Sequence, residues 1–497
     1  MVLLKQTTPY LQTKMDETTK IFCKRYSEAV LNDCAAVFVG AGMSKPCGLP
    51  TWRELLREPL KEIGLNVDKE TDLLSAAQYF TNVKNRRSDL TQHIINLFTA
   101  QKSQPSKAHQ LLASLPIKCV WTTNYDTLLE QAFEAQGKKV DTKRKPEDMC
   151  YPIPMRDVVI HKMHGDITLA GDITLITDDY EEYQTKNELF SNALKTDLSS
   201  KTFLFIGFSM SDPNILNMLG YMKQKLGKHV HPHFCIYKNV QNQDLDKNED
   251  FNYAKSREKL WIENLKRYGI EVIRIDSYEE IDIILKEIKR YVLSKSVFIS
   301  GSAEVYKPLK KEEAKAFIHN LAFKLAERGY KIVTGFGKGV GSCVIHGVLS
   351  FAYRQGRTIE GKLLAMPFPY DIKNKTERDE KWQRYREDMI AQAGNAIFIF
   401  GNKYSENKLS DGEELTDADG VRKEFRIAEA QGLNLFPVGQ TGYASKELWQ
   451  TVSENKSLYY QTSELQNAVQ IMNDVPIDRT AELVDAIVNC IDLTQDL

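Results

Sequence analysis

The chain has 497 residues, of which 42% are hydrophobic and 27% charged, and its formal net charge at pH 7 is −1. This length is more than one hydrophobic core usually serves, so two or three domains of ordinary globular composition are expected. The near-zero charge and the lack of a long basic run remove any bulk electrostatic case for nucleic acid or a membrane as a partner.

The eight cysteines show no C-x-x-C spacing, which argues against a zinc knuckle and against a disulfide framework. Free thiols are typical of a reducing compartment, so we expect a cytoplasmic protein. Residues 1–20 lack the apolar core of a signal peptide, and no apolar stretch approaches the ~20 residues of a membrane span.

The first part of the chain alternates between helical and strand-like periodicity. We predict helices at 19–31, 52–63, 72–83, 89–97, 109–115 and 181–198, and a further helix that begins at Pro213. We predict strands at 35–39, 117–122, 158–161, 173–176, 202–206, 234–237 and 272–275. Such alternation is typical of a mostly parallel, doubly wound sheet.

The same alternation restarts after a helix predicted at 282–293. The next strand begins at Val297, and we predict later strands at 331–334, 363–366, 396–400 and 433–438, with helices at 312–328, 382–393 and 421–430. The expected fold class is therefore α/β, with two Rossmann-like doubly wound parallel-sheet domains. We place them at residues 1–292 and 293–497.

A glycine turn follows the first predicted strand. Gly40, Ala41 and Gly42 come directly after that strand, and Ser44 follows them. A strand, a small-residue turn and a helix start, in this order, can offer backbone N–H groups to a pyrophosphate. A tight turn without a ligand is the alternative, because so short a motif often occurs by chance.

Polar motifs follow three further predicted strands. Residues 122–126 read Thr-Thr-Asn-Tyr-Asp, residues 161–166 read His-Lys-Met-His-Gly-Asp, and residues 207–212 read Gly-Phe-Ser-Met-Ser-Asp. Open α/β sheets bind their ligands at the carboxyl ends of strands, so we expect these motifs to meet at one edge of the sheet.

The order of residues 40–44, 48–52, 123–126 and 164–165 resembles the motif pattern of the sirtuin (Sir2-like) family, over roughly residues 20–290. The resemblance implies NAD+ as substrate and cleavage of its nicotinamide–ribose bond. Deacylating members carry a zinc module with two C-x-x-C pairs, which this chain lacks. The resemblance therefore favours an NAD+ hydrolase (NADase), and a protein deacylase stays an alternative.

Within this resemblance, Asn124 and His164 are the candidate catalytic residues. The Asn124 amide can hold a water or a ribose hydroxyl, and an imidazole with its ordinary pKa of ~6.5 can take a proton from either. A histidine packed in the core is the alternative for His164. The candidate NAD+-binding residues are Gly40, Ala41, Gly42, Ser44 and Asp126, with Ser209 and Asp212 on the adenosine ribose side.

Other histidines carry weaker signals. His229, His231 and His233 alternate along the chain and could share one face, but no fourth ligand is visible, so no metal site is predicted. Strand alternation places His161 on the opposite face from His164.

The second domain resembles the SLOG family of nucleotide-binding proteins. The matching segments are residues 301–302 (Gly-Ser), 335–342 (Gly-Phe-Gly-Lys-Gly-Val-Gly-Ser), 386–389 and 420–424. Hydrolytic relatives carry a Pro-Gly-Gly loop where this chain has Phe-Gly-Asn-Lys at 400–403, followed by a long acidic insertion at 405–419. This departure favours ligand sensing over a second catalytic site.

The candidate activator-binding residues belong to those segments or lie beside them. A glycine loop can wrap phosphates, a guanidinium can bind them bidentately, and an ammonium adds a point charge. The candidates are Gly301, Ser302, Gly337, Gly339, Arg386, Lys403 and Glu424. A surface salt bridge for Arg386 and a solvated helix face for Glu424 are the alternatives.

A Sir2-like domain followed by a SLOG domain resembles the effectors of Thoeris antiphage systems. The resemblance implies an NADase that stays inactive until a cyclic ADP-ribose isomer, made by a TIR-domain partner enzyme, occupies the C-terminal domain. It also implies a homotetramer or a higher assembly. A non-catalytic nucleotide sensor is the remaining alternative.

Overall fold

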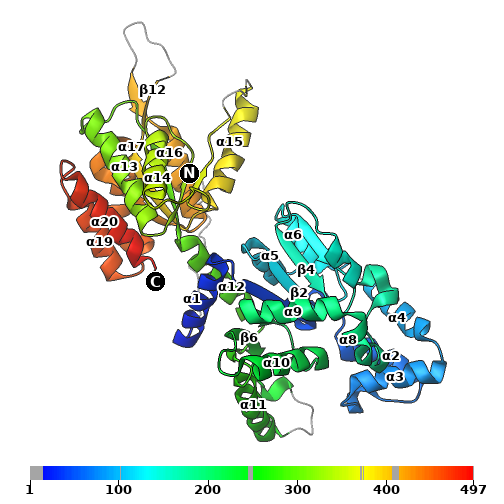
Figure 1. The fold of residues 1–497 in the computed structure, drawn as a ribbon. Helices are drawn as coiled ribbons and strands as arrows, with labels where there is room; N and C mark the ends of the chain where they lie inside the picture. Colours follow the sequence, from blue (N-terminus) through cyan, green and yellow to red (C-terminus); the bar gives the residue numbers. More distant parts are fainter. Residues whose placement is uncertain are drawn as a thin grey trace. The chain divides into compact units, whose positions relative to one another are not determined.

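The computed structural model describes residues 15–495 except 101, 245–249, 370–371, 373 and 406–413. The chain divides into two units, Met1–Lys289 and Arg290–Leu497, and each unit has its own parallel sheet (Figure 1). The dividing line falls inside helix α12 (Glu280–Ser294). Among the helices of the described ranges, none combines the length and the apolarity that crossing a bilayer requires.

The sheet of unit 1 has seven parallel strands in the order β3-β4-β2-β1-β5-β6-β7. The strands are β1 (Ala35–Val39), β2 (Cys119–Thr122), β3 (Val140–Lys143), β4 (Val158–Lys162), β5 (Thr202–Ile206), β6 (His233–Lys238) and β7 (Ile270–Ile275). Fully buried β1 lies between β2 and β5, so the direction of winding reverses there. Ligands of open α/β sheets bind outside the strand ends at such a reversal.

Helices precede, connect or follow these strands, except that the connection from β3 to β4 contains no α-helix. They are α1 (Glu17–Leu31), α2 (Trp52–Glu62), α3 (Leu73–Lys84), α4 (Arg87–Ala100), α5 (Lys107–Ser114), α6 (Leu128–Ala135), α7 (Thr177–Glu181), α8 (Tyr183–Lys186), α9 (Glu188–Ser200), α10 (Pro213–Leu226), α11 (Phe251–Lys266) and α12. Three of these elements, β3, α6 and α11, were not predicted from the sequence.

Two secondary-structure predictions for unit 1 are wrong. Residues 173–176 form no strand: the segment is a buried loop, with Ile173, Leu175 and Ile176 in one apolar cluster with α2, α3 and α4. Its apolar residues gave the same local signal that a buried strand would give. The single helix expected at 181–198 is three helices, α7, α8 and α9.

Unit 2 is built around a five-stranded parallel sheet in the order β10-β9-β8-β11-β14. These strands are β8 (Ser296–Ser302), β9 (Lys331–Thr334), β10 (Leu363–Ala365), β11 (Asn395–Phe400) and β14 (Asn434–Pro437). A small antiparallel pair, β12 (Asn402–Tyr404) and β13 (Leu415–Asp417), follows β11. Part of the acidic insertion, residues 406–413, lies outside the described residues.

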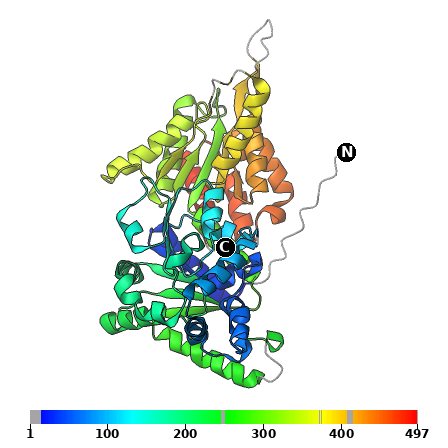
Figure 2. The same cartoon turned by 90° about the vertical axis from the view of Figure 1, so that its right-hand side faces the viewer.

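Helices lie on both sides of the unit 2 sheet. They are α13 (Lys311–Glu327), α14 (Gly341–Arg354), α15 (Lys375–Ile390), α16 (Asp419–Ala430), α17 (Tyr443–Glu454), α18 (Lys456–Tyr459), α19 (Ser463–Asp474) and α20 (Thr480–Leu493). Figure 2 shows yellow-green α13 and α14 on one side of the strands and orange α16 and α17 on the other. The four helices after β14 were not predicted, and α20 packs on both α13 and α19 (Figure 1).

Candidate functional site

A cavity of about 1150 Å³ opens at the carboxyl ends of the unit 1 strands. Drug-sized ligands occupy pockets of about 300–1000 Å³, so this one has room for a dinucleotide. Its wall brings together most of the predicted residues from four separate segments of the chain: Ala41, Gly42, Ser44, Asn124, Asp126, His164, Ser209 and Asp212.

The glycines of the first turn are needed for close packing. A Cβ on Gly40 would lie 2.5 Å from the Gly207 carbonyl oxygen, and one on Gly207 would lie 2.5 Å from the Met43 nitrogen. The amides differ from our expectation, because Gly40 N–H donates to the Ile206 carbonyl and Gly42 N–H to the Gly207 carbonyl, each at 2.9 Å. These two N–H groups already donate to main-chain carbonyls, so they are not free to donate to a pyrophosphate.

Asn124 follows β2 and is held by its own amide group. Its Nδ2 donates to the Gly40 carbonyl and to Ser44 Oγ, each at 3.1 Å. Both contacts use the NH₂ end, so they fix which way the amide oxygen points. Asn124 Oδ1 is buried and has no hydrogen-bond partner among the described residues. It is therefore an acceptor that a ligand hydroxyl or a water in the cavity could satisfy.

Asp126 and Ser44 support this arrangement. Ser44 Oγ donates to Asp126 Oδ2 at 2.8 Å, and the other carboxylate oxygen of Asp126 accepts from the Leu128 N–H at the start of α6. Asn124, Ser44 and Asp126 thus form one hydrogen-bonded chain between the glycine turn and the loop after β2. Both Ser44 and Asp126 are buried.

His164 lies in the turn after β4, where Gly165 adopts a φ of +86°. The imidazole is buried, and the rings of Tyr180 and Tyr183 approach it edge-on with centroids 5.3 and 6.1 Å away. Burial lowers the pKa of His164, and the charges of Asp212 and Asp179 oppose that shift. The ring is therefore neutral at pH 7, as a proton acceptor must be.

Asp212 lines the cavity and also lies close to the His164 imidazole. Its Oδ2 lies 3.4 Å from His164 Nε2 and accepts a hydrogen bond from the Tyr180 hydroxyl at 3.1 Å, while Oδ1 caps α10 by accepting from Ile215 N–H. We expected Asp212 on the adenosine ribose side, whereas its carboxylate here faces the candidate base. Ser209 is exposed on the cavity wall and shares a 2.6 Å hydrogen bond with Ser211.

Several residues of the cavity wall were not predicted from the sequence. Lys238 and Asn239 come at the end of β6, Tyr278 follows β7, and Tyr180 lies on α7. The first three lie at carboxyl ends of predicted strands, so the rule that found Asn124 could also have found them. Tyr180 carries no such signal, because only the tertiary fold brings α7 to His164.

Two of the other histidines, His161 and His233, are buried away from the cavity. His161 stacks on Trp121 at 4.1 Å, and burial lowers its pKa to about 4. His233 Nδ1 accepts from Phe203 N–H, and burial lowers its pKa to about 3. Across the described part of the chain, no group of three or more His, Cys, Asp or Glu side chains is arranged to hold a metal ion.

In unit 2 the predicted glycines pack two turns together. A Cβ on Gly337 would lie 2.0 Å from the Gly301 carbonyl oxygen, and one on Gly339 would lie 2.1 Å from the Ala303 carbonyl oxygen. The glycine loop can therefore lie directly on the turn after β8. Ser302 Oγ donates to the Asn402 carbonyl, which ties the same turn to β12.

Arg386 and Glu424 form a buried ion pair beside that turn. Arg386 Nε lies 3.6 Å from Glu424 Oε1, and Glu424 Oε2 accepts a 2.6 Å hydrogen bond from Ser300 of β8. The guanidinium lies over the rings of Phe368 and Trp382, at 4.7 and 5.7 Å. Burial raises the pKa of Glu424.

The alternative roles of these two residues, a surface salt bridge for Arg386 and a solvated helix face for Glu424, require exposed side chains. Arg386 and Glu424 are instead buried, and each is linked to the carboxyl end of the central strand β8. Lys403 is more exposed and pairs with Asp419 at 3.3 Å. Asp419 precedes Gly420, where a Cβ would lie 3.5 Å from Nη2 of Arg386.

Comparisons with known proteins agree with this two-unit arrangement. A SIR2-like domain model matches residues 118–273, and the model of the Sir2- and TIR-associating SLOG family matches residues 280–494. The chain is 43% identical to the NAD(+) hydrolase ThsA of Cytobacillus dafuensis, over 89% of this chain and 90% of that protein. It is 39% identical to the ThsA of Bacillus cereus, over 90% and 92%, and 37% identical to that of Enterococcus faecium, over 95% and 99%.

Proposed function

Because this chain belongs to the ThsA family of NAD(+) hydrolases, we propose that unit 1 hydrolyses NAD+ to ADP-ribose and nicotinamide. We further propose that unit 2 switches the reaction on when it binds a cyclic ADP-ribose isomer. The observation that carries the first proposal is that Asn124, with an unpaired buried Oδ1, and His164, a neutral imidazole, line one cavity.

The chemistry needs little from the protein beyond positioning and one proton acceptor. The bond between the ribose C1′ and the nicotinamide nitrogen breaks, nicotinamide leaves as a neutral molecule, and positive charge develops on the ribose. Water then adds at C1′ and gives up a proton. Asn124 Oδ1 orients the water or a ribose hydroxyl, and His164 takes the proton, a role worth about 10²–10⁴-fold in rate.

Asp212 supports this role for His164. A carboxylate 3.4 Å from Nε2 favours the charged imidazolium that forms when the ring accepts a proton. The Tyr180 hydroxyl, which donates to the same carboxylate, helps to hold it in place.

The Arg386–Glu424 pair supports a ligand site in unit 2. Anions bind well to a guanidinium fork, and carboxylates accept hydrogen bonds from ribose hydroxyls. A cyclic ADP-ribose isomer offers both kinds of group. Gly301, Ser302, Gly337 and Gly339 supply turns without side chains, or with a small one, beside that pair.

The wider setting is proposed on the family relationship. The matching family model is described as Sir2- and TIR-associating, which supports a TIR-domain enzyme as the source of the activator and a role in antiphage defence through loss of NAD+. The eight free cysteines fit a reducing cytoplasm. A homotetramer or a larger assembly is proposed as the active state.

The direct test uses the purified full chain. NAD+ is incubated with and without each cyclic ADP-ribose isomer, and the products are separated by chromatography. We expect nicotinamide and ADP-ribose in equal amounts, with a large increase for one isomer. An acetylated peptide is added in a parallel reaction, because a deacylase would form O-acyl-ADP-ribose. NAD+ binding without any turnover under all conditions would contradict the proposal and favour a non-catalytic sensor.

A further inference from the structure

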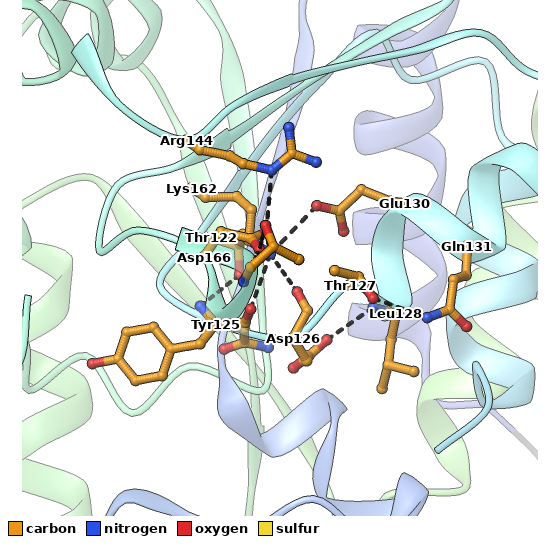
Figure 3. A network of polar contacts seen from close by, with 12 residues as sticks. Thr122, Tyr125, Asp126, Thr127, Leu128, Glu130, Gln131, Arg144, Lys162 and Asp166 are labelled. Carbon is orange, nitrogen blue, oxygen red and sulfur yellow. Dashed lines mark hydrogen bonds and ion pairs between the residues drawn. The ribbon is translucent and has the colours of Figure 1, made fainter. Parts of the chain in front are cut away.

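A fully buried lysine, Lys162, lies at the end of β4. Lysine is almost never fully buried unless it is paired, and the Lys162 side chain has no exposed surface. Its Nζ donates to the carbonyl oxygens of Tyr125 and Asp126 and to the carboxylate of Asp166, and it lies 3.3 Å from Glu130 Oε1 (Figure 3).

Apart from Glu130, which lies on α6, these partners belong to the two loops that carry the candidate catalytic residues. Tyr125 and Asp126 directly follow Asn124, and Asp166 comes two residues after His164. The two loops also share a main-chain hydrogen bond, from Ile167 N–H to the Tyr125 carbonyl at 2.9 Å. One ammonium group therefore joins the loop of the amide to the turn of the imidazole.

Asp166 also holds the segment that follows His164 in place. Its Oδ1 accepts hydrogen bonds from the N–H and the hydroxyl of Thr168, at 2.8 and 2.6 Å, so the carboxylate fixes the start of the next turn. Arg144 approaches the other oxygen at 3.5 Å (Figure 3). Without the ammonium, the buried carboxylates of Asp166 and Glu130 would lose the cation that they share. The Asp126 carbonyl would lose the ammonium as a donor, and the Tyr125 carbonyl would keep only Ile167 N–H.

We propose that Lys162 is a positioning residue for NAD+ cleavage, which sets the distance between Asn124 and His164 by binding the loops of both. The proposal rests on the hydrolase function proposed above. Lys162 is not among the residues that line the cavity, so it acts through the two loops and not on the substrate. Reaction rates are sensitive to such geometry, and a displacement of about 1 Å can cost about 100-fold.

The chain offers a matched control in the neighbouring strand. Lys143, at the end of β3, is also buried, pairs with Asp141 at 2.9 Å and donates to the carbonyls of Asp148 and Tyr151. None of these partners lines the cavity. Lys143→Met therefore removes a comparable buried ammonium and comparable carbonyl contacts without touching either candidate catalytic loop.

The experiment compares Lys162→Met, Lys162→Arg and Lys143→Met in the full chain. For each variant the kcat and KM of NAD+ hydrolysis are measured with the activating cyclic ADP-ribose isomer, together with the thermal midpoint Tm. We expect Lys162→Met to lower kcat about 100-fold with a much smaller change in KM. Lys162→Arg keeps the charge and should recover part of kcat, and Lys143→Met should lower Tm while its kcat stays near wild type.

Two outcomes would overturn the proposal. A folded Lys162→Met protein with wild-type kcat would show that the loops hold their places unaided. An equal loss of kcat in Lys143→Met would show that general destabilisation is the cause. If Lys162→Met does not fold, Asp166→Asn decides: it leaves the lysine in place and weakens its hold on the His164 turn, so kcat should fall about tenfold, and an unchanged kcat contradicts the proposal. An inactive wild-type protein would instead overturn the hydrolase function itself.

Discussion

The two units use the same architecture for different chemistry. In both, glycine turns pack closely at the carboxyl end of a central parallel strand, with Gly207 against Gly40 in unit 1 and Gly337 against Gly301 in unit 2. Unit 1 places a neutral imidazole and an amide at a cavity, whereas unit 2 buries a guanidinium with a carboxylate. A neutral base suits the proposed proton transfer and a fixed cation suits the proposed anion binding, so on these proposals the side chains, and not the fold, distinguish the two units.

The largest expected effect comes from removing the candidate catalytic pair of unit 1, Asn124 and His164. His164→Ala should lower kcat about 10²–10⁴-fold, because it removes the proposed proton acceptor. Asn124→Ala should have a similar effect through loss of the oriented water or hydroxyl. The measurement is nicotinamide release by the activated protein, and Tm confirms the fold. Substantial activity in a folded double variant would leave the assignment without support.

A fall in pH should destabilise unit 1 more than unit 2. The pKa of buried His161 is lowered to about 4 from 6.5, so the unfolded chain binds the proton first as the pH falls. His161 contributes on the order of 3 kcal/mol to the free energy of unfolding. This contribution is complete above pH 6.5 and is lost between pH 6.5 and about pH 4. The raised pKa of Glu424 has the opposite sign, because the folded unit 2 keeps that proton more readily.

Calorimetry of the full chain between pH 7.5 and 4.5 tests this difference. We expect the transition of unit 1 to move down further than that of unit 2. His161→Phe keeps an aromatic ring on Trp121 and removes one titration, so it should reduce the pH dependence of unit 1, to which buried His233 still contributes. The same slope in the variant and the wild type would show that other groups control acid stability.

Removing the cation of unit 2 should affect activation and spare the chemistry. If Arg386 binds the activator as proposed, Arg386→Ala removes charge-assisted contacts, and we expect about 10–100-fold weaker activation, the equivalent of about 1.5–3 kcal/mol. The measurement is activity against the concentration of the cyclic ADP-ribose isomer. Arg328→Ala is the matched control, because Arg328 pairs with Asp492 on the surface of the same unit. Unchanged activator affinity in Arg386→Ala would remove this residue from the sensor site.

The smallest effect is expected from Asp212→Asn. Asparagine still caps α10, so the fold should be retained. The substitution removes the charge that opposes the lowering of the His164 pKa. The acid limb of kcat/KM should therefore move down by about one pH unit, with a modest loss of plateau rate. An unmoved limb would mean that Asp212 does not act on His164.

Much of the molecule could be predicted from local sequence patterns. The strands β1, β2, β4 and β5 and the position of Asn124 and His164 after two of them follow from apolar runs that end in polar motifs. The same local logic failed at residues 173–176, where a buried loop has the composition of a strand. It also did not predict the four helices after β14.

What only the tertiary structure decided is which polar groups meet. The sequence determined the kinds of residue at each strand end, because burial and turn geometry act within a few residues. It did not show that Asp212 faces His164, that the Gly40 and Gly42 amides are used by β5 and the turn after it, or that Lys162 joins two loops. Those contacts depend on the order of strands in the sheet, and segments far apart in the chain set that order by packing together.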